Sequence, residues 1–286
     1  MAKGRAAHRA LAPRHGRPSR PPDRRPATPG AVPLARALSK RGLASRTEAI
    51  ALILAGRVEV DGAVVRDPGL PVVPETLRAV IDGRPAAAPP WRAIVLHKPR
   101  GVVTTRRDPR GRPTVHDLIA PLGGGLAPAG RLDAASSGLL VCTNDTRLAA
   151  WLTDPAHGVE KEYVVTVRGR VAPETLAALE AGIDDGGERL RARSVRTLKA
   201  SARETHLAVV LTAGRNREIR RLFGWAGHEV TRLLRVRIGR LTLGEVPPGG
   251  WRDIRREMVP RFFPGYSGGR PSRPRPSTRA HGGAPL

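Results

Sequence analysis

The sequence predicts an α+β fold with a mostly antiparallel main sheet, in a domain that we place at residues 91–265. Its β-prone runs lie at 93–97, 138–143, 162–168, 205–212 and 230–238. Its helical runs lie at 147–152, 173–182 and 218–226. The two kinds of run do not alternate strictly, as they would in a doubly wound parallel sheet. Hydrophobic residues make up 40% of the 286, which is enough to build a core.

A smaller module precedes this domain, at residues 34–85. Two helices are expected in it, and Ser45 and Glu48 have capping-box spacing at the start of the second. The Asp-Gly pair at 61–62, between two β-prone runs, is a strong hairpin signal. The segment 86–90, AAAPP, reads as a linker. The module is therefore predicted as a helix pair followed by a hairpin.

The chain is strongly basic, with 50 Lys and Arg residues against 25 Asp and Glu and a formal net charge of +25. The segments 1–33 and 266–286 are rich in Pro, Arg and Gly and carry +7 and +4 of this charge. They have no hydrophobic period, so we predict disordered basic tails. The remaining +14 belongs to the folded part, and it favours a polyanionic partner through counterion release.

Residue usage argues against several other classes of protein. No apolar run approaches the roughly 18 residues that span a bilayer, and no signal-peptide stretch is visible, so we expect a cytoplasmic protein without a membrane partner. The single cysteine, Cys142, lies in an apolar run and is expected to be buried. The histidines lack metal-ligand spacing and no phosphate-binding glycine motif occurs, so neither a metal nor a cofactor is expected.

The module at 34–85 resembles the αL-type RNA-binding module of ribosomal small-subunit protein four. The resemblance rests on ARALSKRGLASRTEA at 35–49 and GRVEVDG at 56–62. It implies that basic side chains of the helix pair and the nearby loop bind the RNA backbone. The residues at matching places are Arg36, Lys40, Arg41, Arg46 and Arg57. A solvated basic face on a purely structural module is the alternative, and the agreement of spacing with charge disfavours it.

A loop at 130–138, GRLDAASSG, precedes a β-prone run and contains Asp133. This places Asp133 at a sheet edge, where scaffolded catalytic residues often lie. Taken alone, an aspartate in a loop rich in Gly and Ser is most often a turn residue. Together with Thr-Asn-Asp at 143–145, however, the loop resembles the signature motif of pseudouridine synthases of the RsuA and RluB type.

Further segments resemble the other motifs of that family, in the same order. They are KPRGVVTT at 98–105, KEY at 161–163, GRNREIRR at 214–221, LRVRIG at 234–239 and GGWR at 249–252. The resemblance covers about residues 34–260. It implies an RNA-binding module joined to a pseudouridine synthase catalytic domain, which is an isomerase acting on ribosomal RNA.

The reaction implied by this resemblance moves the uracil of a uridine from a nitrogen to a carbon linkage, without redox change or group donor. A carboxylate can attack an anomeric carbon and form a covalent intermediate, and attack on the base or proton abstraction from the sugar remain alternatives. By resemblance, Asp133 is this carboxylate, Arg220 is its ion-pair partner, and Tyr163 stacks on the uracil. Without the motifs, Arg220 would read as a solvated helix residue and Tyr163 as a sheet-core residue.

The target base must leave its stack, which costs a few kcal/mol. By resemblance, Arg131 fills the gap or holds the flipped nucleotide, and Arg217 of the 214–221 motif is assigned to RNA binding with it. A basic loop follows the first motif, and phosphate binding and plain solvation explain it equally well. Its arginines are Arg100, Arg106, Arg107, Arg110 and Arg112.

Two other functions compete with the isomerase. A non-catalytic RNA-binding or ribosome-assembly protein fits the charge and the module, but it need not retain Asp133, Tyr163 and Arg220 together. A glycosidase using Asp133 needs a second carboxylate, which no motif supplies. The expected partner is ribosomal RNA, with large-subunit RNA slightly favoured by the segments at 234–239 and 249–252, and the default oligomeric state is a monomer.

Overall fold

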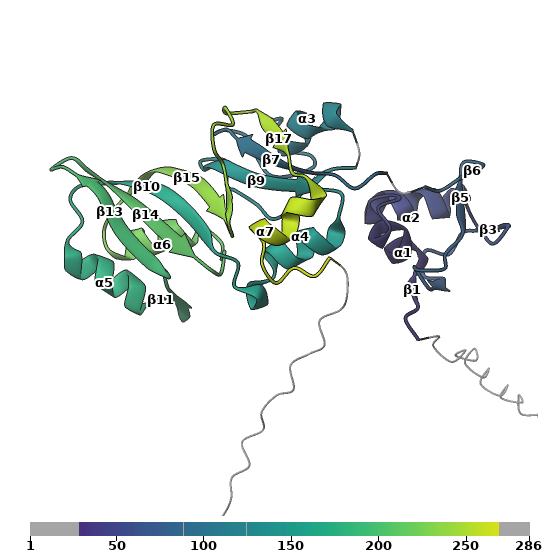
Figure 1. Cartoon of the computed structure of the whole chain (residues 1–286), viewed down its shortest axis with the longest axis horizontal. Coiled ribbons are helices and arrows are strands. Elements are labelled where there is room, and N and C mark those ends of the chain that lie inside the picture. The colour runs from purple at the N-terminus through teal and green to yellow at the C-terminus, as the bar shows by residue number, and fades with distance from the viewer. Residues whose placement is uncertain (1–28, 88, 124, 269–286) are drawn as a thin grey trace, which may run out of the picture.

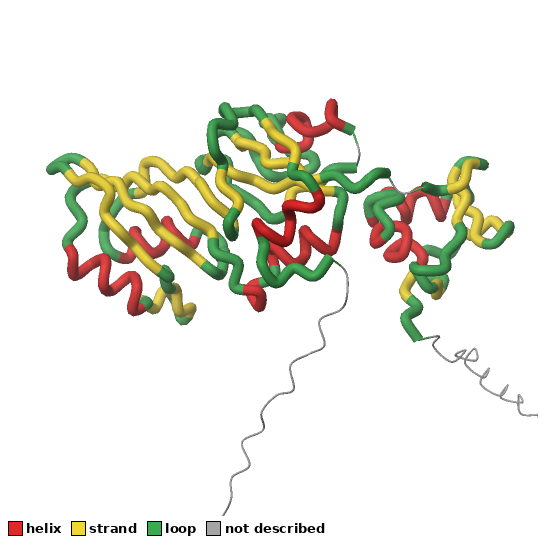
Figure 2. The backbone as a smooth tube through the Cα atoms, viewed as in Figure 1, coloured by secondary structure: helices red, strands yellow, loops and turns green. Residues whose placement is uncertain are grey.

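The computed structural model describes residues 29–87, 89–123 and 125–268 (Figure 1). A small N-terminal module is followed by a larger domain built on one long sheet, as the backbone trace in Figure 2 also shows. The tails predicted at 1–33 and 266–286 lie mostly outside the described residues. Within the described part, no helix is long and apolar enough to cross a membrane.

The N-terminal module consists of a helix pair and short strands. Its elements are α1 (Leu34–Lys40), α2 (Arg46–Leu54), β1 (Val32–Pro33), β2 (Val58–Val60), β3 (Ala63–Val65), β4 (Pro71–Val72), β5 (Ala79–Ile81) and β6 (Arg84–Pro85). The capping box predicted at Ser45 and Glu48 is confirmed, with both hydrogen bonds present. The predicted hairpin is confirmed as β2 and β3, with Asp61 and Gly62 at φ values of 50° and 84°.

The larger domain contains a nine-stranded sheet. Its strands are β7 (Ala93–Lys98), β8 (Ala127–Pro128), β9 (Ser137–Thr143), β10 (Lys161–Arg168), β13 (Ser194–Ala200), β14 (Glu204–Leu211), β15 (Val230–Ile238), β16 (Leu241–Thr242) and β17 (Trp251–Asp253). The main path runs β13-β14-β10-β15-β9-β7-β17. Every pair is antiparallel except β15 with β9, which confirms the mostly antiparallel α+β fold.

Helices pack on the sheet and enclose two cores. They are α3 (Val115–Ile119), α4 (Thr146–Thr153), α5 (Pro173–Ala181), α6 (Glu218–Trp225) and α7 (Val259–Phe262), with 3₁₀ turns at Ala120–Leu122, Pro155–His157 and Arg256–Met258. A small hairpin, β11 (Ile183–Asp185) and β12 (Glu188–Leu190), stands apart from the sheet. Ile94 and Leu96 of β7 join one core, whereas Ala93 and Val95 join the other. This alternation buries both faces of the central strands.

The sequence placed most of the long elements within about one residue, but it missed the seven-residue strand β13. It also missed shorter elements, namely α3, α7, β4, β5, β6, β8, β16, β17 and the β11–β12 hairpin. Two tail boundaries were also wrong. Val32–Pro33 pairs with β4 and belongs to the module. Tyr266 packs on Trp151, and its hydroxyl donates to Asp145 Oδ2 at 3.2 Å, so the folded domain extends beyond 265.

Candidate active site

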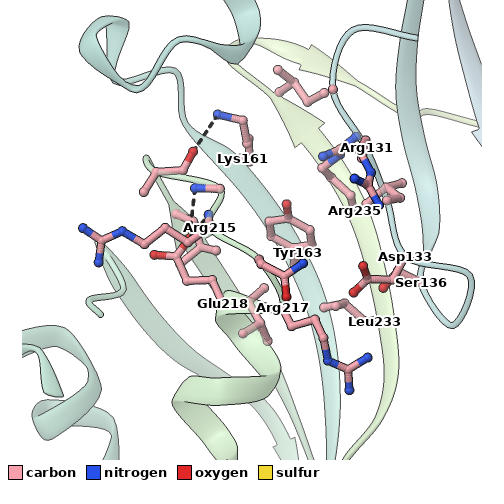
Figure 3. Close-up of a pocket in the computed structure, with 18 of the residues that line it drawn as sticks. Arg131, Asp133, Ser136, Lys161, Tyr163, Arg215, Arg217, Glu218, Leu233 and Arg235 are labelled. Carbon is pink, nitrogen blue, oxygen red and sulfur yellow. Dashed lines mark hydrogen bonds between the residues drawn. The ribbon is translucent and has the colours of Figure 1, made fainter. Parts of the chain in front are cut away.

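A cavity of about 390 Å³ opens over β10 and β15 (Figure 3). Tyr163 lies at its centre, with Asp133 and Ser136 on one side and Lys161 on the other. The cavity is lined by the loop before β9, by the end of α4, by residues of β10, β14 and β15, and by the turn before α6. The charged side chains among the lining residues are Arg131, Asp133, Lys161, Arg215, Arg217, Glu218 and Arg235.

The loop that holds Asp133 is hydrogen-bonded on both sides of the aspartate. Thr104 Oγ1 donates to the carbonyl of Leu132 at 2.8 Å, and the amide of Leu132 lies 3.2 Å from the same hydroxyl. The amide of Gly101 donates to the carbonyl of Ala134 at 2.8 Å. The backbone at Asp133 is therefore fixed by the segment after β7, and its carboxylate is partly buried at the cavity wall.

Lys98 lies behind this loop with no exposed surface. Its Nζ donates to the carbonyls of Pro99 and Ser136, both at 2.9 Å. Burial lowers the pKa of Lys98 to about 8, although the charge of Asp133 acts in the opposite direction. Lys98 thus joins the end of β7 to the loop that carries Asp133.

Arg235 and Tyr163 are cross-strand neighbours on β15 and β10. The Arg235 guanidinium lies 6.0 Å from the Tyr163 ring centroid, and its Nε donates to the carbonyl of Leu139 at 2.7 Å. Arg235 is only 4% exposed, and its Nη2 has no hydrogen-bond partner. Tyr163 is 7% exposed, so it is both a core residue and part of the cavity lining.

Two more residues shape the cavity on the side away from Asp133. Lys161 Nζ donates to the carbonyl of Val159 at 2.9 Å, and burial followed by the nearby charge of Arg235 lowers the pKa of Lys161 to about 8. Glu218 is 3% exposed, and its Oε2 accepts from the amides of Gly214 and Arg215 at 2.9 and 3.0 Å. This buried carboxylate fixes the turn before α6.

Arg217 and Arg220 occupy different places around the cavity. Arg217 precedes α6 in a left-handed conformation, at φ 50°, and it lines the cavity, while its role in RNA binding stays a prediction. Arg220 is not among the lining residues, and no ion pair joins it to Asp133 among the contacts of the described residues. Its Nη1 instead donates to the carbonyl of Val230 at 2.7 Å, and its Nη2 lies 3.5 Å from the carbonyl of Ala135.

Backbone carbonyls thus accept from both terminal nitrogens of Arg220, its buried Nε has no hydrogen-bond partner among the described residues, and its pairing with Asp133 stays a prediction. Burial and the neighbouring charge of Arg217 lower the pKa of Arg220, and the charge of Asp133 opposes this at longer range. Arg220 therefore interacts with Asp133 through its charge and contacts the carbonyl of Ala135, two residues further along the same loop.

The five basic residues predicted for the N-terminal module divide into two groups. Arg36, Lys40 and Arg46 are exposed on the helix pair. Arg57 pairs with Asp82, with two hydrogen bonds of 2.6 Å, and Arg41 Nη1 donates to the carbonyl of Leu77. The first group is free to meet a ligand, whereas the second contributes to the structure of the module.

Sequence reasoning gave no role to three residues at the site, namely Lys98, Arg235 and Glu218. All three lie inside segments that resemble the family motifs, which is the signal that the sequence offered, although the motifs gave these residues no individual role. The hydrogen bond of Arg235 joins it to Leu139, almost a hundred positions away, so no local pattern indicates this partner. No cluster of three or more His, Cys, Asp or Glu residues that could hold a metal occurs in the described part of the chain.

Comparison with known proteins identifies the class of both parts. Residues 32–77 match the S4 domain, and residues 92–225 match the family described as RNA pseudouridylate synthase. An S4 domain joined to a catalytic domain of this kind defines an RNA-modifying isomerase.

The chain belongs to the RNA pseudouridylate synthase family, as its relatives also show. It is 37% identical to an uncharacterized RNA pseudouridine synthase of Aquifex aeolicus, over 79% of this chain and 91% of the relative. It is 40% identical to ribosomal large subunit pseudouridine synthase B of Escherichia coli K12, over 77% and 78% of the two chains. A crystal structure of a pseudouridylate synthase superposes with a TM-score of 0.57 at 25% identity, covering 81% of this chain and 99% of that one.

Proposed function

We propose that this protein isomerises a specific uridine of ribosomal RNA to pseudouridine, with the carboxylate of Asp133 as the nucleophile. The observation that carries the proposal is the shared cavity of Asp133 and Tyr163, surrounded by the cations Arg131, Lys161 and Arg235. The cavity offers a carboxylate, an aromatic ring for a base, and positive charge for a phosphodiester.

Each group has a defined task in this proposal. The Asp133 carboxylate forms a covalent bond to the nucleotide, either at ribose carbon 1′ or on the pyrimidine ring, and the bond from carbon 1′ to nitrogen 1 breaks. The freed uracil turns against the ring of Tyr163. Carbon 5 then bonds to carbon 1′ and loses its proton, nitrogen 1 gains a proton, and Asp133 is released. Atoms and charge balance without a cofactor.

Large-subunit ribosomal RNA is the substrate that we favour. The relative from Escherichia coli, 40% identical to this chain, is named for that subunit. The S4 domain adds the exposed cations Arg36, Lys40 and Arg46, which are suited to phosphate contacts that give affinity without reading the sequence. We propose that the S4 domain holds the RNA while the cavity selects the uridine. We also propose that the enzyme is a monomer and that it acts in the cytoplasm.

The test is to map pseudouridines in ribosomal RNA from cells that lack the gene. The gene is then restored as the native form or as Asp133→Asn, which removes the nucleophile with little change of shape. Loss of one site that only the native form restores supports the activity, the substrate and the role of Asp133. Full restoration by Asp133→Asn would refute that role.

A measurement with purified protein separates catalysis from binding. RNA labelled with tritium at carbon 5 of uridine releases tritium to water when the new carbon–carbon bond forms. We expect release with the native protein and none above background with Asp133→Asn, at equal affinity for the RNA. Tight binding without release by the native protein would favour a non-catalytic RNA-binding protein.

Removal of the S4 domain tests its assigned task. Deleting residues 1–85 is expected to weaken RNA binding and to reduce its salt dependence, while the catalytic domain stays folded. Unchanged affinity and salt slope would contradict this assignment.

A further inference from the structure

A second cavity, of about 450 Å³, lies on the other side of Asp133 from the first. The loop 103–112 forms one wall, and residues 131–135 with Arg217 form the other. Arg131, Leu132, Asp133 and Arg217 line both cavities. The two cavities therefore adjoin at the loop that carries Asp133, so a nucleotide bound in one would have its neighbours close to the other.

The second cavity is strongly cationic. Four arginines line it, Arg107, Arg112, Arg131 and Arg217, and the acid on its outer wall is Asp108. That acid is already neutralised, because Arg112 donates to it from Nε at 2.9 Å and from Nη2 at 2.7 Å. The side chains of Arg107, Arg131 and Arg217 make no hydrogen bond or ion pair with other described residues. The second cavity is therefore lined by three guanidinium groups that are free to bind a ligand.

The loop that forms the outer wall is held in place before any ligand binds. The Asp108 side chain is 5% exposed, and Arg112 holds the pKa of its carboxyl well below the usual range. The amides of Val103 and Val115 donate to the carbonyls of Pro113 and Val103, both at 2.9 Å, which closes the base of the loop. A preformed loop loses little entropy on binding, so its cations are suited to a fixed anionic ligand.

The lining also indicates which part of an RNA would fit. It contains four arginines, two threonines, aliphatic residues and the carboxylates of Asp108 and Asp133, but no aromatic ring. Arg112 pairs with Asp108, so the other three arginines outnumber the one remaining carboxylate, that of Asp133. Bases bind single-strand readers largely by stacking on rings, whereas phosphates bind guanidinium groups and hydroxyls. Charge and composition together therefore favour the backbone over a base.

We infer that the second cavity binds backbone phosphates of the nucleotides that flank the target uridine, with Arg107 as a principal contact. The inference rests on the proposed function and adds the flanking backbone to what the enzyme recognises. It also connects recognition to chemistry. Thr104 donates to Leu132, and Gly101 donates to Ala134, so the segment that would hold the phosphate is hydrogen-bonded to the backbone on both sides of Asp133.

The test compares Arg107→Gln with Arg196→Gln, a matched control on the exposed outer strand β13. The probe is the ribosomal RNA fragment that carries the mapped uridine, titrated between about 50 and 200 mM salt. For Arg107→Gln we expect binding to weaken about three- to tenfold and the slope of log affinity against log salt to fall by about 1. The control should match the native protein, and thermal unfolding should show both variants folded.

Neutral linkages in the RNA show where the contact lies. Each phosphate within about three nucleotides of the uridine is replaced in turn by a methylphosphonate, which removes its charge. At one flanking position, the replacement should weaken RNA binding by the native protein. The same replacement should not weaken RNA binding by Arg107→Gln any further.

Two outcomes overturn the inference and leave the proposed function standing. One is an Arg107→Gln variant with the affinity and salt slope of Arg196→Gln. The other is additivity at every position, where each methylphosphonate weakens RNA binding by Arg107→Gln as much as it weakens RNA binding by the native protein. Failure of the native protein to convert the fragment at all would instead refute the proposed function, before any variant is compared.

Discussion

Replacing Gly138 with alanine tests the close backbone contact between β9 and β15 at the cavity. Gly138 lies where β9 meets β15 as a parallel pair, opposite Arg235. A Cβ at this position would lie 2.6 Å from the Arg235 nitrogen and 2.9 Å from its carbonyl carbon, with the carbonyl oxygen nearer still. These are backbone atoms, so no side chain can turn aside to make room.

The cost follows from two terms. Gly138 has φ of 109°, and an alanine held at positive φ is strained by about 1–2 kcal/mol. The strands must also separate at the two paired positions, Leu234 with Ser137 and Arg235 with Gly138, and each lost backbone hydrogen bond costs about 1 kcal/mol. We therefore expect Gly138→Ala to lower the free energy of unfolding by about 3–4 kcal/mol.

The assay is equilibrium unfolding in urea together with tritium release. Gly186→Ala is the matched control, because Gly186 also has positive φ, 64°, but an added Cβ would meet nothing within 4 Å. The control should lose only the strain, about 1–2 kcal/mol, and keep its activity. Equal destabilisation of the two variants, with Gly138→Ala fully active, would refute the claim that the strand contact determines the site.

Three further predictions concern buried groups. Glu218→Ala leaves two amides of the turn before α6 without their acceptor. It should lower the free energy of unfolding by about 2–3 kcal/mol, and it should also lower kcat/KM. An unchanged kcat/KM would contradict a positioning role for Glu218. Burial lowers the pKa values of Lys98 and Lys161 from 10.5 to about 8, so the unfolded chain binds more protons between these pH values. The free energy of unfolding attributable to these lysines should therefore rise with pH across that window, and a Lys98→Met, Lys161→Met double variant should show a smaller rise in urea unfolding. Burial raises the pKa of the Cys142 thiol to about 12, so a thiol reagent should label it only in the unfolded protein; rapid labelling of the native protein would contradict this.

Local sequence determined the long elements and their ends. The capping box at Ser45 and Glu48 and the turn at Asp61 and Gly62 depend on residues no more than three positions apart, so the sequence contains the whole interaction. The strands of the central sheet are apolar on both faces, and their runs are therefore continuous and easily seen. These are the elements that the sequence placed within about one residue.

Elements that depend on a partner were missed. Strand β13 is at the edge of the sheet and is exposed along most of its length, so its sequence, SVRTLKA, has no apolar run. Pairing with β14 alone defines it as a strand. The same holds for β17, three residues long, which exists because it pairs with β7. Tyr266 was assigned to a tail because the residues that cover it, Trp151 and Asp145, are remote in sequence.

By itself, the sequence determined the family, the two modules, the basic charge and the motif that contains Asp133. Only the tertiary structure decided what surrounds that aspartate. It placed Lys98 behind the loop that carries Asp133, Arg235 beside Tyr163, and backbone carbonyls against the guanidinium of Arg220. The physical reason is that burial and hydrogen bonding of these charged groups depend on chain segments that meet only when the sheet forms.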